Sequence, residues 1–281
     1  MFMTKIKNST IKELEQKLEQ NPSDFKLRKL YAEALLDNGF LEDALNQYKK
    51  LLKIFPDSVE IIFNIGIIFE KQNKFEEAKT YFEKAVSLSP EDPDFRYNLA
   101  FVLDKKGEID EAIKEYQKTL ELNPEDSNAH FNLGYLYKVK NKFELAKKHF
   151  EITLQINPQD IYARFNLACE YKREGKIEKS LQEYKELLKI SPDYSWAYFN
   201  IGCIYYEQDK LDQAMEYFTK TIEANPKDIE VYKIMSYLAL NKDNYKQAID
   251  YLKTALLQNP ESDDFKYLTS KIEEIKKLLK K

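Results

Sequence analysis

The sequence predicts an all-α fold, an α-solenoid built from repeated pairs of helices. Three observations lead to this prediction. Eight of the nine prolines lie 34 residues apart: Pro22, Pro56, Pro90, Pro124, Pro158, Pro192, Pro226 and Pro260. Between successive prolines, apolar residues recur in two stripes with helical spacing, so each period contains two helices. Only 6 glycines occur among 281 residues, whereas 33% of the residues are charged, which favours long helices over sheets and loops.

Residues 1–24 precede the first full period and predict a single helix. Thr10 followed by Glu13 is a capping-box pattern, which predicts that this helix begins at Ile11 and ends at Gln20. We interpret the segment as an N-terminal half-repeat that caps the array.

Seven full repeats follow, at residues 25–58, 59–92, 93–126, 127–160, 161–194, 195–228 and 229–262. In the fourth repeat, one apolar stripe runs from Ala129 to Tyr137 and the second from Phe143 to Ile156. The second helix of a repeat ends at an Asn-Pro or Ser-Pro pair, because the residue before proline is pushed out of the helical region.

A glycine or a short polar residue stands between the two helices of every repeat. Such residues tolerate the left-handed backbone that a helix end requires, so each pair is predicted to be joined by a tight turn. The residues are Gly39, Asn73, Gly107, Asn141, Gly175, Asp209 and Asp243. The glycines alternate between two places in successive repeats, a 68-residue period that we interpret as duplication of a repeat pair.

Residues 263–281 predict a C-terminal capping helix. Its apolar stripe consists of Phe265, Leu268, Ile272, Ile275 and Leu279. Lysines on the opposite face keep that side hydrated, which favours a solubilising cap. A basic amphipathic helix could instead touch a membrane surface, but Glu273 and Glu274 dilute its charge.

The repeats resemble the tetratricopeptide repeat (TPR) family over about residues 25–262. The resemblance rests on a small residue at the eighth position, alanine at the twentieth, an aromatic residue at the twenty-fourth and proline at the thirty-second. In the fourth repeat these residues are Gly134, Ala146, Phe150 and Pro158. The resemblance implies a right-handed superhelix whose first helices line a concave groove that binds extended peptides or helices.

Composition argues against several classes of function. The net charge is −4 and the isoelectric point about 5.6, so no continuous basic face for nucleic acid is expected. The longest apolar run, from Ile61 to Phe69, is too short to span a membrane, and we expect a soluble, cytoplasmic protein. Cys169 and Cys203 imply no disulfide framework.

The sequence contains few candidates for catalytic residues. His130 and His149 are the only histidines, and neither has a second histidine or a cysteine at metal-ligand spacing. There is no glycine-rich phosphate loop and no nucleophile elbow. We therefore predict a protein that is not an enzyme and needs no cofactor or metal.

An asparagine ladder runs along the groove that the resemblance implies: Asn64, Asn98, Asn132, Asn166 and Asn200 share the sixth position of their repeats. An amide side chain both donates and accepts hydrogen bonds, so the ladder could hold a peptide backbone. It could equally brace adjacent helices, and the sequence leaves the two interpretations open.

Aromatic and basic residues gather in repeats four to six, whereas acidic residues prevail in repeats two and three. Aromatic side chains beside cations are typical of binding hot spots. These residues predict a site for a partner segment with apolar and acidic residues: Tyr135, Lys138, Tyr162, Phe165, Lys172, Arg173, Trp196 and Tyr206.

The predicted function is that of a scaffold or adaptor that binds other proteins or peptides. An alternative is the substrate-recruiting, non-catalytic subunit of a glycosyltransferase system, because long arrays with an asparagine ladder resemble those attached to such enzymes. The partner and the oligomeric state stay open.

Overall fold

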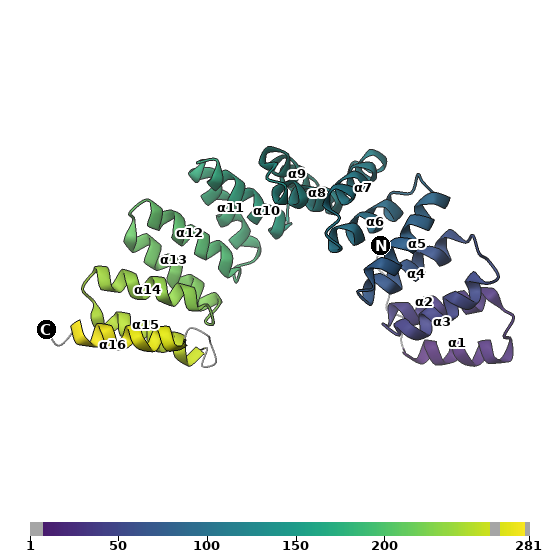
Figure 1. The fold of residues 1–281 in the computed structure, drawn as a ribbon, viewed down its shortest axis with the longest axis horizontal. Coiled ribbons are helices and arrows are strands. Elements are labelled where there is room, and N and C mark those ends of the chain that lie inside the picture. Colours follow the sequence, from purple (N-terminus) through teal and green to yellow (C-terminus); the bar gives the residue numbers. More distant parts are fainter. Residues whose placement is uncertain (1–7, 259–264, 279–281) are drawn as a thin grey trace. The chain divides into compact units, whose positions relative to one another are not determined.

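The computed structural model describes residues 8–258 and 265–278, and every regular element among them is a helix (Figure 1). The helices are α1 (Asn8–Gln20), α2 (Phe25–Asp37), α3 (Leu41–Leu52), α4 (Val59–Lys71), α5 (Phe75–Leu88), α6 (Pro93–Lys105), α7 (Ile109–Leu122), α8 (Ser127–Val139), α9 (Phe143–Ile156), α10 (Ile161–Arg173), α11 (Ile177–Ile190), α12 (Ser195–Glu207), α13 (Leu211–Ala224), α14 (Ile229–Asn241), α15 (Tyr245–Gln258) and α16 (Phe265–Leu278). They pack as consecutive pairs, from α2 with α3 to α14 with α15. The predicted all-α solenoid of helix pairs is confirmed.

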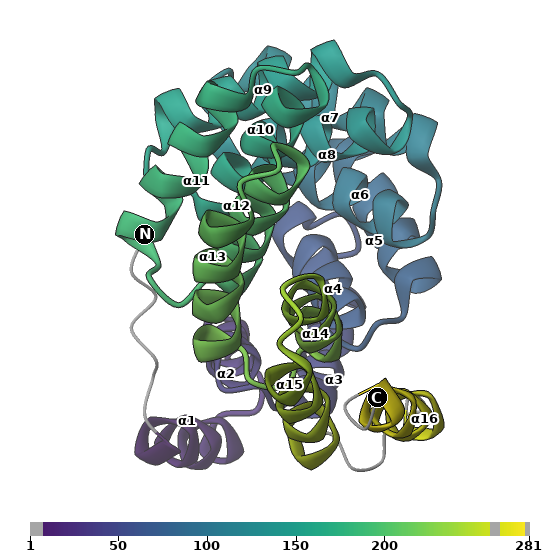
Figure 2. The same cartoon turned by 90° about the vertical axis from the view of Figure 1, so that its left-hand side faces the viewer.

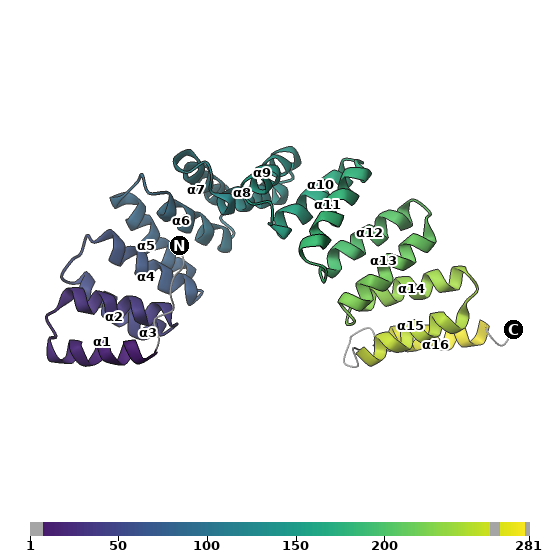
Figure 3. The same cartoon turned by 180° about the vertical axis from the view of Figure 1, so that it is seen from behind.

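The chain divides into two compact bodies, Met1–Ile156 and Asn157–Lys281. We call them the N-terminal body, which contains α1 to α9, and the C-terminal body, which contains α10 to α16. Within each body the pairs follow one another in chain order, and Figures 2 and 3 show this succession from two further directions.

The first helices of the seven repeats begin at Phe25, Val59, Pro93, Ser127, Ile161, Ser195 and Ile229, each the first residue of a predicted repeat. The repeat boundaries themselves stay a prediction. At the N-terminus, α1 begins at Asn8, so Thr10 lies inside the helix and the predicted start at Ile11 is wrong. Pro260 and Leu279 lie outside the described residues.

Aspartate residues are the N-caps of most of the first helices. The Asp126 carboxylate accepts a hydrogen bond from the Ala129 backbone N–H at 2.9 Å, and Asp160 accepts from Ala163 at 2.9 Å. Asp24, Asp92 and Asp228 form the same kind of cap. Such caps satisfy N–H groups that the first turn leaves without a partner, and each contributes about 1 kcal/mol.

All seven predicted turn residues have a left-handed backbone, as predicted. The φ angles are 82° at Gly39, 57° at Asn73, 79° at Gly107, 57° at Asn141, 74° at Gly175, 58° at Asp209 and 53° at Asp243. The chain therefore reverses after each first helix at the residue that tolerates this conformation.

Glycine permits close helix crossing in the even repeats. A Cβ atom built on Gly202 would lie 2.7 Å from Cε1 of Phe218, a side chain that is only 1% exposed. Gly66 and Gly134 meet Phe82 and Phe150 in the same way. The glycines at this position are therefore required by packing, and their alternation has a structural cause.

In the first, third and fifth repeats an arginine braces the repeat to the loop before it. The Arg96 guanidinium donates to the Pro90 carbonyl oxygen at 2.8 Å and to the Glu115 carboxylate at 2.9 Å. Arg28 bonds Pro22 and Gln47, and Arg164 bonds Pro158 and Glu183, in the same arrangement. Each arginine thus joins both helices of its repeat to the preceding loop.

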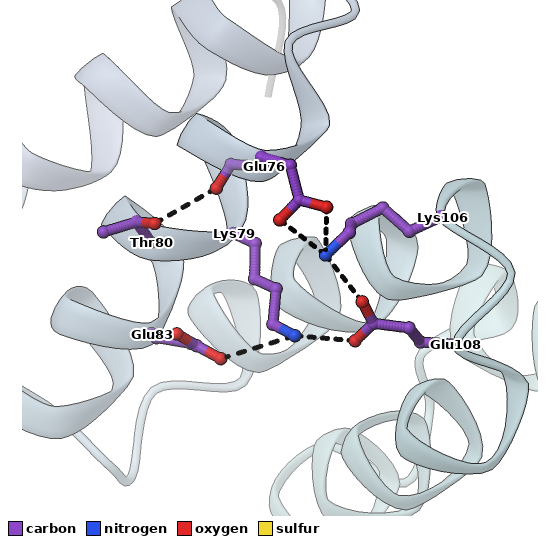
Figure 4. A network of polar contacts seen from close by, with 6 residues as sticks. All are labelled: Glu76, Lys79, Thr80, Glu83, Lys106 and Glu108. Carbon is purple, nitrogen blue, oxygen red and sulfur yellow. Dashed lines mark hydrogen bonds and ion pairs between the residues drawn. The ribbon is translucent and has the colours of Figure 1, made fainter.

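Ion pairs join neighbouring repeats at the helix ends (Figure 4). The Lys106 ammonium lies 2.8 Å from the Glu76 carboxylate and 2.6 Å from that of Glu108. Lys79 lies 2.6 Å from Glu108. These hydrogen bonds raise the pKa of Lys106 and lower that of Glu108. Because the carboxylates are solvated, the network adds little stability and mainly fixes how the repeats meet.

Candidate functional site

Exposed aromatic side chains gather on the first helices of the C-terminal body. Tyr162 is 59% exposed, Trp196 57%, Tyr206 40%, Tyr237 53% and Tyr267 50%. The five residues come from α10, α12, α14 and α16 at spacings that place them on one side of their helices. We call this side of the four helices the aromatic face. Large aromatic side chains left in solvent together are typical of interaction surfaces.

Three of these aromatic residues, Tyr162, Trp196 and Tyr206, are among the predicted site residues. Phe165 is half-buried, and its ring packs against Tyr184 and Tyr194 at centroid distances of 5.7 and 5.6 Å. Phe165 therefore belongs partly to the core beneath the face.

Sequence reasoning missed Tyr237 and Tyr267, together with Lys233 and Lys271 beside them. Extending the 34-residue numbering into the terminal helix would have found them, because Tyr267 takes the place of Lys233 and Lys271 that of Tyr237. The terminal helix α16, predicted to act only as a cap, thus adds side chains to the same face.

The predicted cations of the C-terminal body differ in what they contact. The Lys172 ammonium lies 2.8 Å from the Glu207 carboxylate, which ties α10 to α12 at the surface. The Arg173 guanidinium instead donates to the buried Glu170 carboxylate at 2.8 Å. An ion is costly to bury without its partner, so Arg173 has a structural task, whereas the exposed pair of Lys172 is weak.

The asparagine ladder is engaged within the protein. The amide nitrogens of Asn98, Asn166 and Asn200 donate to the backbone carbonyl four residues earlier in their own helices, at 2.7, 2.8 and 2.8 Å. The Asn132 amide donates to the Tyr97 hydroxyl at 3.1 Å, and this bond joins α8 to α6. Asn64 lies half-buried on α4. Asn132 therefore braces two helices, and contact of the ladder with a partner peptide stays a prediction.

The predicted site is divided between the two bodies. Tyr135, which is 47% exposed, and Lys138 lie on α8 in the N-terminal body, and the remaining aromatic and basic residues lie in the C-terminal body. On α6 of the N-terminal body, burial raises the pKa of the Asp94 and Asp104 carboxyls. Acidic residues of the N-terminal body thus lie on a first helix, as the sequence predicts.

His130 and His149 form a pair in the fourth repeat. The Pro124 carbonyl lies 3.1 Å from His130 Nε2 and can only accept, so Nε2 carries the proton in neutral His130. The Nδ1 atoms of the two rings are 2.9 Å apart, so His149 Nδ1 donates to His130 Nδ1. Burial, with the nearby His130 and Lys148, lowers the pKa of His149 to about 4.

The described part of the chain was also compared with what a metal site, a disulfide or a membrane-spanning helix requires. Residues 8–258 and 265–278 contain no group of three or more His, Cys, Asp and Glu placed to hold a metal ion. Neither cysteine is in a disulfide, and Cys169 Sγ lies 3.2 Å from the Tyr184 hydroxyl. None of the described helices is apolar over a length that would cross a membrane.

Repeated antiparallel helix pairs with a small residue at each crossing define a helical repeat protein. The chain belongs to the tetratricopeptide repeat family. Models of that family, described as tetratricopeptide repeat or TPR repeat, match residues 32–73, 69–133, 127–160, 170–209 and 195–228. Proteins of this family mediate protein–protein interactions and are typically non-catalytic scaffolds. No curated protein matches the chain.

Solved structures of TPR proteins are similar to this chain. The C-terminal part of a TPR protein from Cytophaga hutchinsonii has a TM-score of 0.72 at 20% identity, covering 86% of this chain and 97% of that one. A TPR protein from Parabacteroides merdae has a TM-score of 0.62 at 20% identity, covering 89% and 98%. YrrB, described as a TPR protein with an unusual peptide-binding site, has a TM-score of 0.56 at 27% identity, covering 66% and 95%.

Proposed function

We propose that this protein is a scaffold that binds a segment of a partner protein on the aromatic face of its C-terminal body. The observation that carries the proposal is the set of five aromatic side chains, each at least 40% exposed, on the first helices α10, α12 and α14 and the terminal helix α16. Aromatic rings that stay in solvent do not contribute burial energy to folding. A partner that covers them contributes favourable free energy of binding, because their apolar surface is then removed from water.

The segment that fits this face carries apolar and acidic residues. Lys172 lies on α10, and its partner Glu207 is more than half exposed, so a carboxylate of the partner protein can replace Glu207 at small cost. The amide nitrogen of Asn200 donates a hydrogen bond to the backbone carbonyl of Trp196. The amide oxygen of Asn200 can therefore accept a hydrogen bond from a peptide N–H.

The residues of this face are suited to binding rather than to catalysis. Tyrosine, tryptophan and lysine side chains on it provide contact area and charge, and no nucleophile lies beside a general base. The likeness to YrrB, a TPR protein with a peptide-binding site, agrees with a peptide-like partner. We also propose a cytoplasmic location, where the thiols of Cys169 and Cys203 would stay reduced.

Affinity capture from native extract tests this proposal with paired variants. Trp196→Ala combined with Tyr206→Ala removes two exposed rings of the aromatic face. Lys253→Ala combined with Leu257→Ala removes exposed side chains of α15, a second helix, as the matched control. Proteins retained by the wild type and the control but lost by the face variant support the proposal. Equal retention by both variants would move binding to another surface.

A further inference from the structure

A small cavity lies where the terminal helix α16 packs on the last helix pair. Its volume is about 160 Å³, and its lining comes from α14, α15 and α16, which lie together at the C-terminal end of the chain (Figure 1). Leu252 and Ile275 supply buried apolar lining, at 3% and 2% exposure. Tyr237 and Tyr267 line its exposed part and also belong to the aromatic face.

The size of the cavity selects one side chain of a partner. An apolar cavity of about 150 Å³ in another protein accommodates benzene, so this one has room for the side chain of a phenylalanine or a leucine. Ser236, which lines the cavity at a position where the other repeats carry alanine or glycine, adds a hydroxyl to the lining. The pocket is therefore apolar at its floor and polar on one side.

The charged residues among the described lining of the cavity are two lysines, Lys233 and Lys271. The Lys233 ammonium lies 5.3 Å from the centroid of the Tyr267 ring. Both lysines form ion pairs outside the cavity, with Glu230 and Glu274 at 2.8 Å each, and these glutamates are 69% and 60% exposed. Such surface pairs are weak, so both ammonium groups can turn toward an anion that arrives.

We propose that this cavity binds an apolar side chain that has an acidic residue as its chain neighbour in a partner protein segment. The apolar side chain occupies the space between Leu252 and Ile275, and the neighbouring carboxylate lies between Lys233 and Lys271. The inference deepens the proposed function, because it assigns the terminal helix α16 a role in binding and gives one subsite its chemistry.

The test uses the full chain and the blocked peptide acetyl-Gly-Glu-Phe-Gly-amide as the probe, with the methyl groups of Leu252 and Ile275 observed by NMR. We expect saturable shifts of both residues. The peptide with glutamine in place of glutamate should bind about tenfold more weakly, because it loses a charge-assisted interaction. Lys233→Gln and Lys271→Gln should weaken binding of the glutamate peptide similarly, whereas Lys253→Gln on α15 should not.

Three results would overturn the inference. One is the absence of saturable shifts at Leu252 and Ile275, and another is equal affinity for the glutamate and glutamine peptides. The third is binding of 3-phenylpropionate as tight as that of the peptide, which would assign the cavity to free small carboxylates. Trp196 does not line the cavity, so failure here leaves the capture experiment with the Trp196 variant interpretable by itself.

Discussion

At the residue scale, one column of the repeat shows how different side chains perform the same structural task. In the first, third and fifth repeats an arginine such as Arg96 bonds the preceding proline carbonyl and a side chain of the second helix. In the fourth repeat His130 takes the place of the arginine, bonds Pro124 and receives a hydrogen bond from His149. The arginine is charged at every relevant pH, whereas the histidine pair works only while its rings are neutral.

The histidine pair makes stability depend on pH in a defined window. The pKa of His149 is lowered from 6.5 to about 4 in the folded protein. Between these values the unfolded chain binds a proton that the folded protein does not, so stability is lost as the pH falls from 6.5 toward 4. We expect His149→Tyr, the residue that Tyr217 provides in the sixth repeat, to lose less stability in this window.

Urea denaturation of both proteins at steps between pH 7 and pH 4 measures this difference. Parallel stability curves for the wild type and His149→Tyr would contradict the assignment.

At the element scale, helix crossing decides which residue each helix carries. Gly202 sits inside α12, where glycine is costly to helix formation, because the ring of Phe218 lies against its backbone. The first, third and fifth repeats have alanine at this position and a tyrosine in place of the phenylalanine, for example Ala168 with Tyr184. Packing between elements thus overrides the preference of a single helix.

The sign of one substitution tests this conclusion. Helix propensity alone predicts that Gly202→Ala stabilises the protein by about 1 kcal/mol. We expect destabilisation of about 1–2 kcal/mol instead, because the new methyl group would lie 2.7 Å from Phe218. Denaturation of Gly202→Ala, Phe218→Leu and the double variant gives the coupling energy. The conclusion would be contradicted if Gly202→Ala were more stable than the wild type, or if the effects of the two substitutions on the free energy of unfolding were strictly additive. Either result would show that the helix crossing can hold a methyl group without strain.

Much of each element could be predicted from the sequence because the repeat fixes local geometry. The turn residues, from Gly39 to Asp243, were predicted to be left-handed, since few residues tolerate that backbone. The cavity between α14 and α16 could not be predicted, because it depends on how the terminal helix packs on the last pair. The bracing role of Asn132 likewise depends on the Tyr97 hydroxyl of a neighbouring repeat.

At the scale of the whole molecule, the 34-residue period runs through Ile156 without interruption, yet the chain forms two compact bodies that meet in sequence there. The period describes what each repeat shares with the next and does not predict where the chain divides into compact bodies. The predicted site in repeats four to six therefore combined Tyr135 of one body with Trp196 of the other. The aromatic face of the C-terminal body is complete without Tyr135.

The central claim is that a partner segment lies on the aromatic face, and site-specific photo-crosslinking tests it most directly. A photoreactive benzoylphenylalanine replaces Trp196 on the face or, in the matched control, Leu257 on α15, which is 80% exposed. We predict that position 196 crosslinks to one defined segment of a partner, containing apolar and acidic residues by mass spectrometry, and that position 257 does not. Crosslinks of that segment to position 257 alone, or equally to both positions, would contradict the account.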